Sequence, residues 1–296
     1  ITRDEAGYFD LGPLDHGEST RREVCMNLEE MGFEIEASHH ECAIGQHEID
    51  FKYVDALDGA DKIMTLKLAV KTLAQKNGLH ATFMPKPVYG VAGSGMHLNM
   101  SLFKDGRNVF YDEGGQRQLS KTARSFIAGL LRHADGFTAL TNPLVNSYKR
   151  LGAGYEAPRY KAWSSANRST LIRIPSVRGQ STRVELRSPD PACNPYLAIG
   201  LILAAGLDGI EKRMVLPPPV NRNLFDAAEA EGLGLETLPA TLEEAVQVAE
   251  ESEFLRKVLP EGLSKRYFSE ELKRCAALRN APDQAEHERV YYFNAI

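Results

Sequence analysis

The first third of the chain switches between two hydrophobic periodicities. Apolar residues recur at helical intervals over residues 17–33 and again over 60–77, and a glycine lies at or just after the end of each segment. Between them, residues 34–54 alternate apolar and polar positions in short pieces. This part of the sequence therefore predicts a helix, a pair of short strands and a second helix.

The middle third repeats this mixture. Residues 96–103 alternate like a strand and lead into a turn-forming KDGRN segment at 104–108, which predicts a hairpin. Residues 118–135 have helical spacing. Residues 142–158 contain two prolines and two glycines with little periodicity, and we predict a long loop there, of the kind that is usually functional.

The last part begins with strand-like segments at 170–175 and 182–188, followed by a helical segment at 195–212. Residues 217–296 have mainly helical spacing. Strands that lie next to one another in the sequence, with helices grouped separately, favour an α+β fold over regular strand–helix alternation.

Composition narrows the class of protein. Hydrophobic residues make up 43% of the 296 residues and charged residues 25%, which is typical of a folded globular chain. The formal net charge of −5 argues against a nucleic-acid partner. The longest apolar run, residues 197–207, has 11 residues, whereas a membrane span needs about 20. We expect no nucleic-acid and no membrane partner.

The four cysteines are widely spaced and form no CxxC pair, which predicts neither a disulfide framework nor a cysteine zinc site. A reducing cytoplasmic location is therefore expected. The chain opens at Ile1 without a recognisable targeting segment, and we expect the natural protein to begin earlier.

Polar residues follow the predicted strands at intervals of two, which points them to one face of a sheet. They are His39, Glu41, Gln46, Glu48 and Asp50, then His97, Asn99 and Ser101, and finally Arg173, Arg183, Glu185 and Arg187. One interpretation is a solvated sheet face. The other is a site, because carboxylates with a histidine suit Mg²⁺ or Mn²⁺ and arginines suit phosphate. Together with Arg168, these residues favour a metal-dependent enzyme that uses ATP.

Two further segments carry candidate chemistry. The glycines of GSGMH at 93–97 would let the backbone approach a ligand closely, although this signal is weak by itself. The predicted loop carries Arg150 and Glu156. It is interpreted either as an ordinary charged surface loop or as a lid that excludes water from a reacting group.

Several long strings in this sequence resemble one family. ASHHE with GQHEIDF, ATFMPKP with GSGMH, NPLVNSYKR with GYEAP, NRSTLIRIP, and VELRSPDPACNPYLA are similar to the catalytic domain of type I glutamine synthetase. The similarity runs from about Gly7 to Asp208 and more loosely to the end. The resemblance implies an α+β fold of the glutamine synthetase/guanidino kinase type, a curved antiparallel sheet flanked by helices. It implies one catalytic domain over 1–296, truncated at its N-terminus, with 217–296 as its helical C-terminal part.

The resemblance also implies an activity. The family joins ammonia to L-glutamate with ATP through γ-glutamyl phosphate, and uses two or three Mg²⁺ or Mn²⁺ ions. A homo-oligomer, a dodecamer of two hexameric rings, is implied as well. Two alternatives stay open: a γ-glutamyl-amine ligase of the same fold that acts on a polyamine, and a non-catalytic structural or regulatory relative.

Residue roles follow by match to the family's motifs. The implied metal ligands are Glu41 and Glu48 for one ion and His97 and Glu185 for another. The implied ATP-binding residues are Tyr53, Ser101, Arg168, Arg173 and Arg183. The implied substrate-binding residues are Arg150 for the glutamate carboxylate, Gly93, His97, and Tyr8 near the ammonium. The implied catalytic residues are the flap glutamate Glu156 together with Arg168 and Arg187.

Some departures from the family are visible. The family's E-x-E strand and its N-terminal β-grasp domain have no counterpart before Tyr8, so we expect this chain to be a fragment that is inactive alone. The usual LVPGYEAP is LGAGYEAP here, which should loosen the flap because a proline is replaced and Gly152 lies beside it. Phe225 stands where adenylylated members carry tyrosine, and this modification is not expected.

Overall fold

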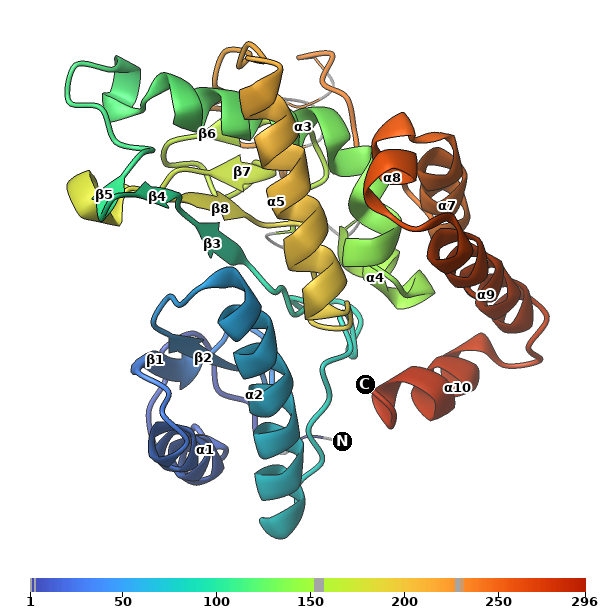
Figure 1. The fold of residues 1–296 in the computed structure, drawn as a ribbon. Helices are drawn as coiled ribbons and strands as arrows, with labels where there is room; N and C mark the ends of the chain where they lie inside the picture. Colours follow the sequence, from blue (N-terminus) through green and yellow to red (C-terminus); the bar gives the residue numbers. More distant parts are fainter. Residues whose placement is uncertain (1, 3, 152–156, 227–229, 231) are drawn as a thin grey trace. The chain divides into compact units, whose positions relative to one another are not determined.

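The computed structural model describes residues 2, 4–151, 157–226, 230 and 232–296. The chain forms two compact units (Figure 1). Unit 1 comprises Ile1–Ser94 with Glu288–Ile296, and unit 2 comprises Gly95–His287. Each unit has its own hydrophobic core.

Unit 1 is built from two helices, a two-stranded hairpin and a final helical turn. They are α1 (Glu18–Glu30), β1 (Ile35–His40), β2 (His47–Phe51), α2 (Ala56–Lys76) and η3 (Arg289–Phe293). The buried face of α1 with Val24 and Leu28 packs against Leu73 of α2 and against Phe33, which precedes the hairpin. The α1, β1–β2 and α2 segments match the three elements that the hydrophobic pattern predicts.

The boundaries of these elements have local causes. Gly32 and Gly78 follow α1 and α2 with φ of +86° and +72°, a left-handed conformation that glycine adopts without steric cost. The strands pair antiparallel, with His39 opposite Glu48 and His40 opposite His47.

Unit 2 contains a four-stranded sheet in the order β3-β8-β7-β6. Its strands are β3 (Leu98–Met100), β8 (Val184–Leu186), β7 (Ile172–Arg173) and β6 (Trp163–Ser164). The outer pair β6–β7 is parallel, whereas β7–β8 and β3–β8 are antiparallel, so the expectation of a wholly antiparallel sheet is wrong at this edge. A separate ribbon of β4 (Phe103–Lys104) and β5 (Arg107–Asn108) forms a hairpin at the predicted place, but the single strand predicted over 96–103 is divided between β3 and β4, and β5 lies within the predicted turn.

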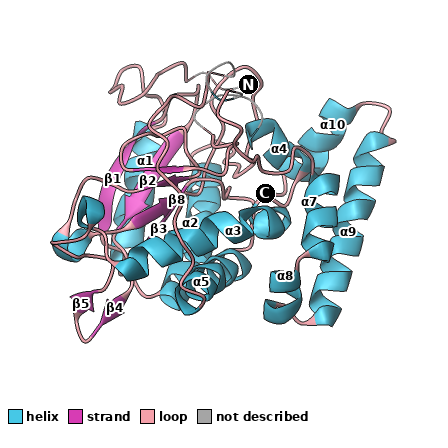
Figure 2. Ribbon diagram, turned by 90° about the horizontal axis from the view of Figure 1, so that it is seen from above, coloured by secondary structure: helices cyan, strands magenta, loops and turns pink. Residues whose placement is uncertain are grey.

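Helices make up most of the rest of unit 2. They are α3 (Lys121–Thr141), α4 (Val145–Leu151), α5 (Pro195–Glu211), α7 (Leu242–Glu251), α8 (Glu253–Val258) and α9 (Glu261–Arg279). Two short 3₁₀ turns are η1 (Gln116–Gln118) and η2 (Gly179–Ser181). The last residue of α10 (Gln284–Glu288) is counted with unit 1. Helices α3 and α5 lie side by side (Figures 1 and 2). Their backbones touch, because a Cβ on Gly129 would come within 2.2 Å of the Ala205 carbonyl oxygen and one on Gly209 within 2.2 Å of the Ser125 carbonyl oxygen.

The prediction of an irregular loop at 142–158 is wrong over Val145–Leu151, because these seven residues form helix α4. The helix has only seven residues, too few for a periodic pattern to stand out. Its buried side chains include the polar Asn146, Ser147 and Arg150, so its inward face does not show the apolar pattern by which a helix is predicted.

Helices α3 and α5 pack against the sheet through one continuous core that includes Phe126, Leu171, Ile172, Leu186 and Leu201. The separate helices and the mixed sheet confirm the predicted α+β class. None of the described helices is long and apolar enough to cross a membrane.

Candidate active site

The β1–β2 hairpin of unit 1 gathers acidic groups around one histidine. The ligand atoms of His39, Glu48 and Asp50 all lie within 4.8 Å of one another. Glu41 belongs to the same group, since its Oε1 lies 4.0 Å from His39 Nδ1. His39 Nδ1 donates to the His40 carbonyl oxygen at 3.0 Å, which leaves the lone pair of neutral His39 on Nε2, 3.9 Å from Glu48 Oε1.

This crowding changes the acidity of Glu48. Burial, and then the neighbouring Glu41 and Asp50 carboxyl groups, together raise its pKa to about 8. Three carboxyl groups and an imidazole lone pair form a donor set that fits a hard divalent cation, which would supply the positive charge that this group of side chains lacks. The two residues predicted as ligands, Glu41 and Glu48, thus lie beside His39 and Asp50, and their metal role stays a prediction.

A second cluster in unit 1 combines Asp4, His40 and His47 within the same distance limit. Arg21 Nη1 donates to His47 Nδ1 at 2.8 Å, so the proton of neutral His47 is on Nε2, which faces Asp4 Oδ2 at 3.5 Å. Burial and the charge of Arg21 lower the pKa of His47 to about 4. His47 thus faces Asp4 as a hydrogen-bond donor, and the cluster fastens the N-terminal segment to the hairpin.

The other predicted residues of unit 1 surround the hairpin. Tyr8 is 48% exposed, with its ring centroid 5.5 Å from that of His39. The Gly93 carbonyl oxygen accepts a hydrogen bond of 3.0 Å from Gln46 in the β1–β2 connection. Tyr53 follows β2 and is 74% exposed, so its side chain is held by few contacts. The adenine role of Tyr53 stays a prediction.

In unit 2, Glu185 on β8 is the centre of an ion-pair network. Its Oε1 lies 3.1 Å from Arg187 Nη1 and 3.6 Å from His97 Nδ1, and its Oε2 accepts from Arg173 Nε. Sheet register explains the meeting of these groups, because Arg173 on β7 and Asn99 on β3 both lie opposite Glu185. Glu185 is only 3% exposed, so these partners compensate a buried charge.

His97 and Arg150 meet at Gly95. A Cβ on Gly95 would lie 2.6 Å from Arg150 Nη2 and 2.7 Å from His97 Nε2, so this glycine lets both side chains approach the backbone. Burial by surrounding protein, and then the charges of Arg187 and Arg150, lower the pKa of His97 well below its usual range, although about a third of its side chain reaches solvent. A neutral imidazole of this kind is the form that binds metal.

The remaining predicted residues of unit 2 lie around this network. Arg183 Nε donates to Asn99 Oδ1 at 3.2 Å, and Ser101 directly follows β3. Arg168 is exposed in the connection between β6 and β7, and its charge also acts on His97. Glu156 lies outside the described residues.

Sequence reasoning missed the buried residues behind Arg150. Asn142 and Asp190 are completely buried and joined by a hydrogen bond of 3.0 Å, although they are 48 residues apart in the sequence. The NP and DP dipeptides in which they occur are ordinary turn signals and gave no indication of this pairing.

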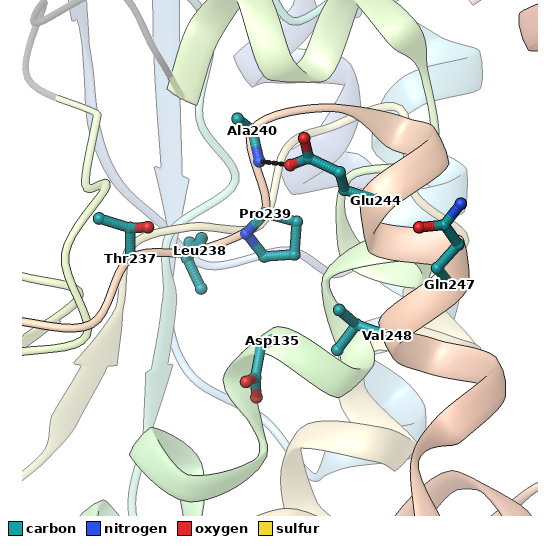
Figure 3. A pocket seen from close by; sticks show the side chains of 8 residues that line it. All are labelled: Asp135, Thr237, Leu238, Pro239, Ala240, Glu244, Gln247 and Val248. Atoms are coloured by element: carbon teal, nitrogen blue, oxygen red, sulfur yellow. Dashed lines mark hydrogen bonds between the residues drawn. The ribbon is translucent and has the colours of Figure 1, made fainter.

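A cavity of about 310 Å³ lies elsewhere in unit 2, beside α3 and α7 (Figure 3). Its lining residues are Asp135, Thr237, Leu238, Pro239, Ala240, Glu244, Gln247 and Val248. No residue that the sequence predicts for the site is among them. Its two carboxylates already have partners: Asp135 pairs with Lys161, and Glu244 accepts from the Ala240 N–H.

Comparison with known proteins agrees with the motifs. Residues 1–290 match the family model for the glutamine synthetase catalytic domain. A glutamine synthetase from Clostridium saccharobutylicum is 58% identical over 270 residues, which cover 90% of this chain and 61% of that protein. A glutamine synthetase from Staphylococcus aureus (strain MW2) is 58% identical over 258 residues, 86% of this chain and 58% of that protein. The chain thus spans about 60% of the length of these curated relatives.

Solved structures with the same fold include two of GmaS. A GmaS/ADP complex superimposes with a TM-score of 0.87 at 35% identity, covering 98% of this chain and 67% of that one. A ligand-free GmaS gives a TM-score of 0.85 at 36% identity, covering 96% and 65%. With a family match over 290 of 296 residues, the ordered motifs and the shared fold, the chain belongs to the glutamine synthetase catalytic-domain family.

Proposed function

We propose that this chain carries the catalytic residues of a glutamine synthetase, which ligates ammonia to L-glutamate at the expense of ATP through γ-glutamyl phosphate. The observation that carries the proposal is the Glu185 network, in which a buried carboxylate and His97 lie among guanidinium groups. Phosphoryl transfer depends on positioning and on compensation of phosphate charge, and this network offers both.

We propose two or three Mg²⁺ or Mn²⁺ ions as cofactors. Glu41 and Glu48 of the hairpin would hold one ion, and His97 and Glu185 would hold another. Bound divalent cations would neutralise phosphate charge during transfer. Both oxygens of Glu185 now accept from Arg173 and Arg187, so nucleotide phosphates that engaged these arginines would release the carboxylate for a metal.

The other side chains are proposed to bind and orient substrates. Arg168, Arg173 and Arg187 would hold phosphate oxygens through their guanidinium forks, and Arg183 would contact the nucleotide. The adenine would lie near Tyr53 and Ser101.

The amino-acid side of the reaction would use a second group of residues. Arg150 would bind the α-carboxylate of L-glutamate and Gly93 its backbone, while Tyr8 would lie near the ammonium. Glu156 would accept a proton from ammonium and shield the acyl phosphate from water.

Assembly and location follow from the family and from the cysteines. We propose a homo-oligomer, a dodecamer in the complete protein, which size-exclusion chromatography with light scattering would test. No disulfide joins Cys25, Cys42, Cys193 or Cys275 in the described part of the chain, and Cys193 and Cys275 are buried. This agrees with the reducing cytoplasm that we propose as location.

The proposed activity is tested by ATP- and Mn²⁺-dependent formation of γ-glutamyl hydroxamate. The assay compares this chain with a version extended by the N-terminal segment of a family member. Activity of the extended version alone is the expected result. Glutamine formation by the present chain would refute the prediction that it is inactive alone.

The acceptor is tested separately, with ammonia and putrescine compared in the extended version. Preference for putrescine would favour the γ-glutamyl-amine ligase. Activity with neither acceptor would favour a non-catalytic relative.

A further inference from the structure

The guanidinium of Arg150 is almost completely enclosed, with 3% of the residue exposed. Its Nη1 donates to the Ser188 carbonyl oxygen at 2.7 Å, and its Nη2 donates to the Arg187 carbonyl oxygen at 3.0 Å. Burial lowers the pKa of Arg150 to about 10, so the group still carries its charge at neutral pH. A buried charge of this kind needs fixed acceptors and a compensating negative charge.

The Ser188 carbonyl connects Arg150 to a second donor. Asn142 Nδ2 donates to the same oxygen at 2.8 Å and also to Asp190 Oδ2 at 3.0 Å. Thr141 Oγ1 in turn donates to Asn142 Oδ1 at 3.0 Å. A continuous hydrogen-bonded chain therefore runs from Asp190 through Asn142 and the Ser188 carbonyl to Arg150.

Asp190 is held on several sides and is completely buried. Its Oδ1 accepts from the Ala192 N–H at 3.0 Å, and its own N–H donates to the Thr141 carbonyl oxygen at 3.1 Å. It also forms a hydrogen bond with Ser147 on α4, three residues before Arg150. Its charge acts on Arg150 from the same enclosed region.

We propose that Asp190, acting through Asn142 and the Ser188 carbonyl, is the positioning residue that fixes the Arg150 guanidinium for the α-carboxylate of L-glutamate. This inference rests on the proposed function, which makes Arg150 the carboxylate-binding residue. Bidentate recognition of a carboxylate depends on the plane of the guanidinium. The Ser188 carbonyl oxygen is a fixed acceptor for Arg150 Nη1, and the Asp190 carboxylate supplies the compensating negative charge. Both therefore help to hold the plane of the guanidinium.

The test is calorimetric titration of the chain with L-glutamate and, separately, with ADP in Mg²⁺. Asp190→Asn keeps the size of the side chain and removes its charge. We expect the Kd for L-glutamate to rise about tenfold, since small misplacements of binding groups are costly, while the Kd for ADP stays within about twofold. Glu271→Gln is the matched control, because it removes another buried carboxylate of unit 2 and should leave both constants unchanged.

The outcomes separate the two proposals. If the unaltered chain does not bind L-glutamate, or if Arg150→Gln binds it equally well, the substrate role of Arg150 fails, and the inference falls with it. If Arg150→Gln weakens binding and Asp190→Asn does not, only the positioning role is refuted. Should Asp190→Asn fail to fold, Ser147→Ala removes a single hydrogen bond to Asp190. An unchanged Kd for L-glutamate in that variant would overturn the inference.

Discussion

Glu185 and Arg173 lie directly opposite each other on neighbouring strands of unit 2, and the Arg173 Nε–H donates to Glu185 Oε2. The other oxygen of the carboxylate is 3.1 Å from Arg187 Nη1. The strand register of β7 and β8 thus places one acidic side chain between two basic ones. Without Glu185, the buried guanidinium of Arg187 would lose this carboxylate partner.

Glu185→Gln is therefore expected to destabilise unit 2 in the absence of metal and nucleotide. Breaking a buried ion pair from one side typically costs about 3 kcal/mol or more, and urea denaturation followed by circular dichroism measures the loss. Glu261→Gln is the control, because Glu261 pairs with Lys265 on the surface of α9. An unchanged unfolding midpoint for Glu185→Gln would contradict the compensating role of this carboxylate.

Gly95→Ala is expected to impair ligand binding more than stability. The atoms nearest to the added Cβ would be Arg150 Nη2 at 2.6 Å and His97 Nε2 at 2.7 Å. These side-chain ends would have to move, and both belong to the candidate site. We expect a Kd for L-glutamate raised about tenfold, with a Tm close to that of the unaltered chain. Gly200→Ala is the matched control, since nothing lies within 4 Å of its Cβ, and a glutamate Kd equal in the two variants would disprove the prediction.

Glu271 on α9 should make stability depend on pH. The residue is 2% exposed, its Oε2 has no hydrogen-bond partner, and burial raises its pKa to about 7 against the opposing charge of Arg274. The folded chain therefore keeps a proton that the unfolded chain releases near pH 4.5. Its contribution to stability is present at low pH and is lost as pH rises through about 7.

Glu271→Gln should remove this contribution to the pH dependence. Tm values measured between pH 5 and pH 8 are expected to fall less steeply for the variant than for the unaltered chain. Parallel curves would show that Glu271 is ionised in the folded protein throughout this range.

The hairpin of unit 1 should bind Mn²⁺ through its carboxylates. Glu48→Gln and Asp50→Asn are each expected to weaken Mn²⁺ binding by about tenfold or more, because each removes a charged oxygen ligand. Calorimetry or the electron paramagnetic resonance of free Mn²⁺ measures the change. Asp4→Asn serves as control, because Asp4 belongs to the hydrogen-bonded cluster around His47. Loss of Mn²⁺ binding in Asp4→Asn alone would place the metal in that second cluster.

Much of the element order was predictable because it rests on local periodicity. The helix predicted over 60–77 corresponds to α2, which starts four residues earlier at Ala56 because Asp55 takes the extended conformation of an N-cap. The helix predicted over 118–135 continues to Thr141, since buried residues persist to its end. The two-residue alternation also placed Glu48 on β2 and Glu185 on β8, whereas Arg187 directly follows the end of β8.

Long-range pairing was not predictable in the same way. The parallel pairing of β6 with β7 involves only two residues on each strand, which leave no periodic signal. The link from Asn142 to Asp190 joins a helix end to the segment after a strand, and no spacing rule connects positions 48 residues apart. The short helix α4 escaped detection because polar side chains occupy part of its buried face.

The imbalance of charge around Glu185 has a practical consequence for handling the protein. Unit 2 contributes five arginines to the candidate site but only two of the carboxylates discussed with them, Glu185 and Asp190. The arginines are Arg150, Arg168, Arg173, Arg183 and Arg187. We expect a polyanion that binds several of these guanidinium groups to bind the folded chain and not the unfolded one. At a free anion concentration one hundred times its Kd, such binding would raise the free energy of unfolding by about 2.7 kcal/mol. We therefore expect phosphate or sulfate in a storage buffer to stabilise the folded chain, and melting temperatures to be comparable only between samples in the same anion.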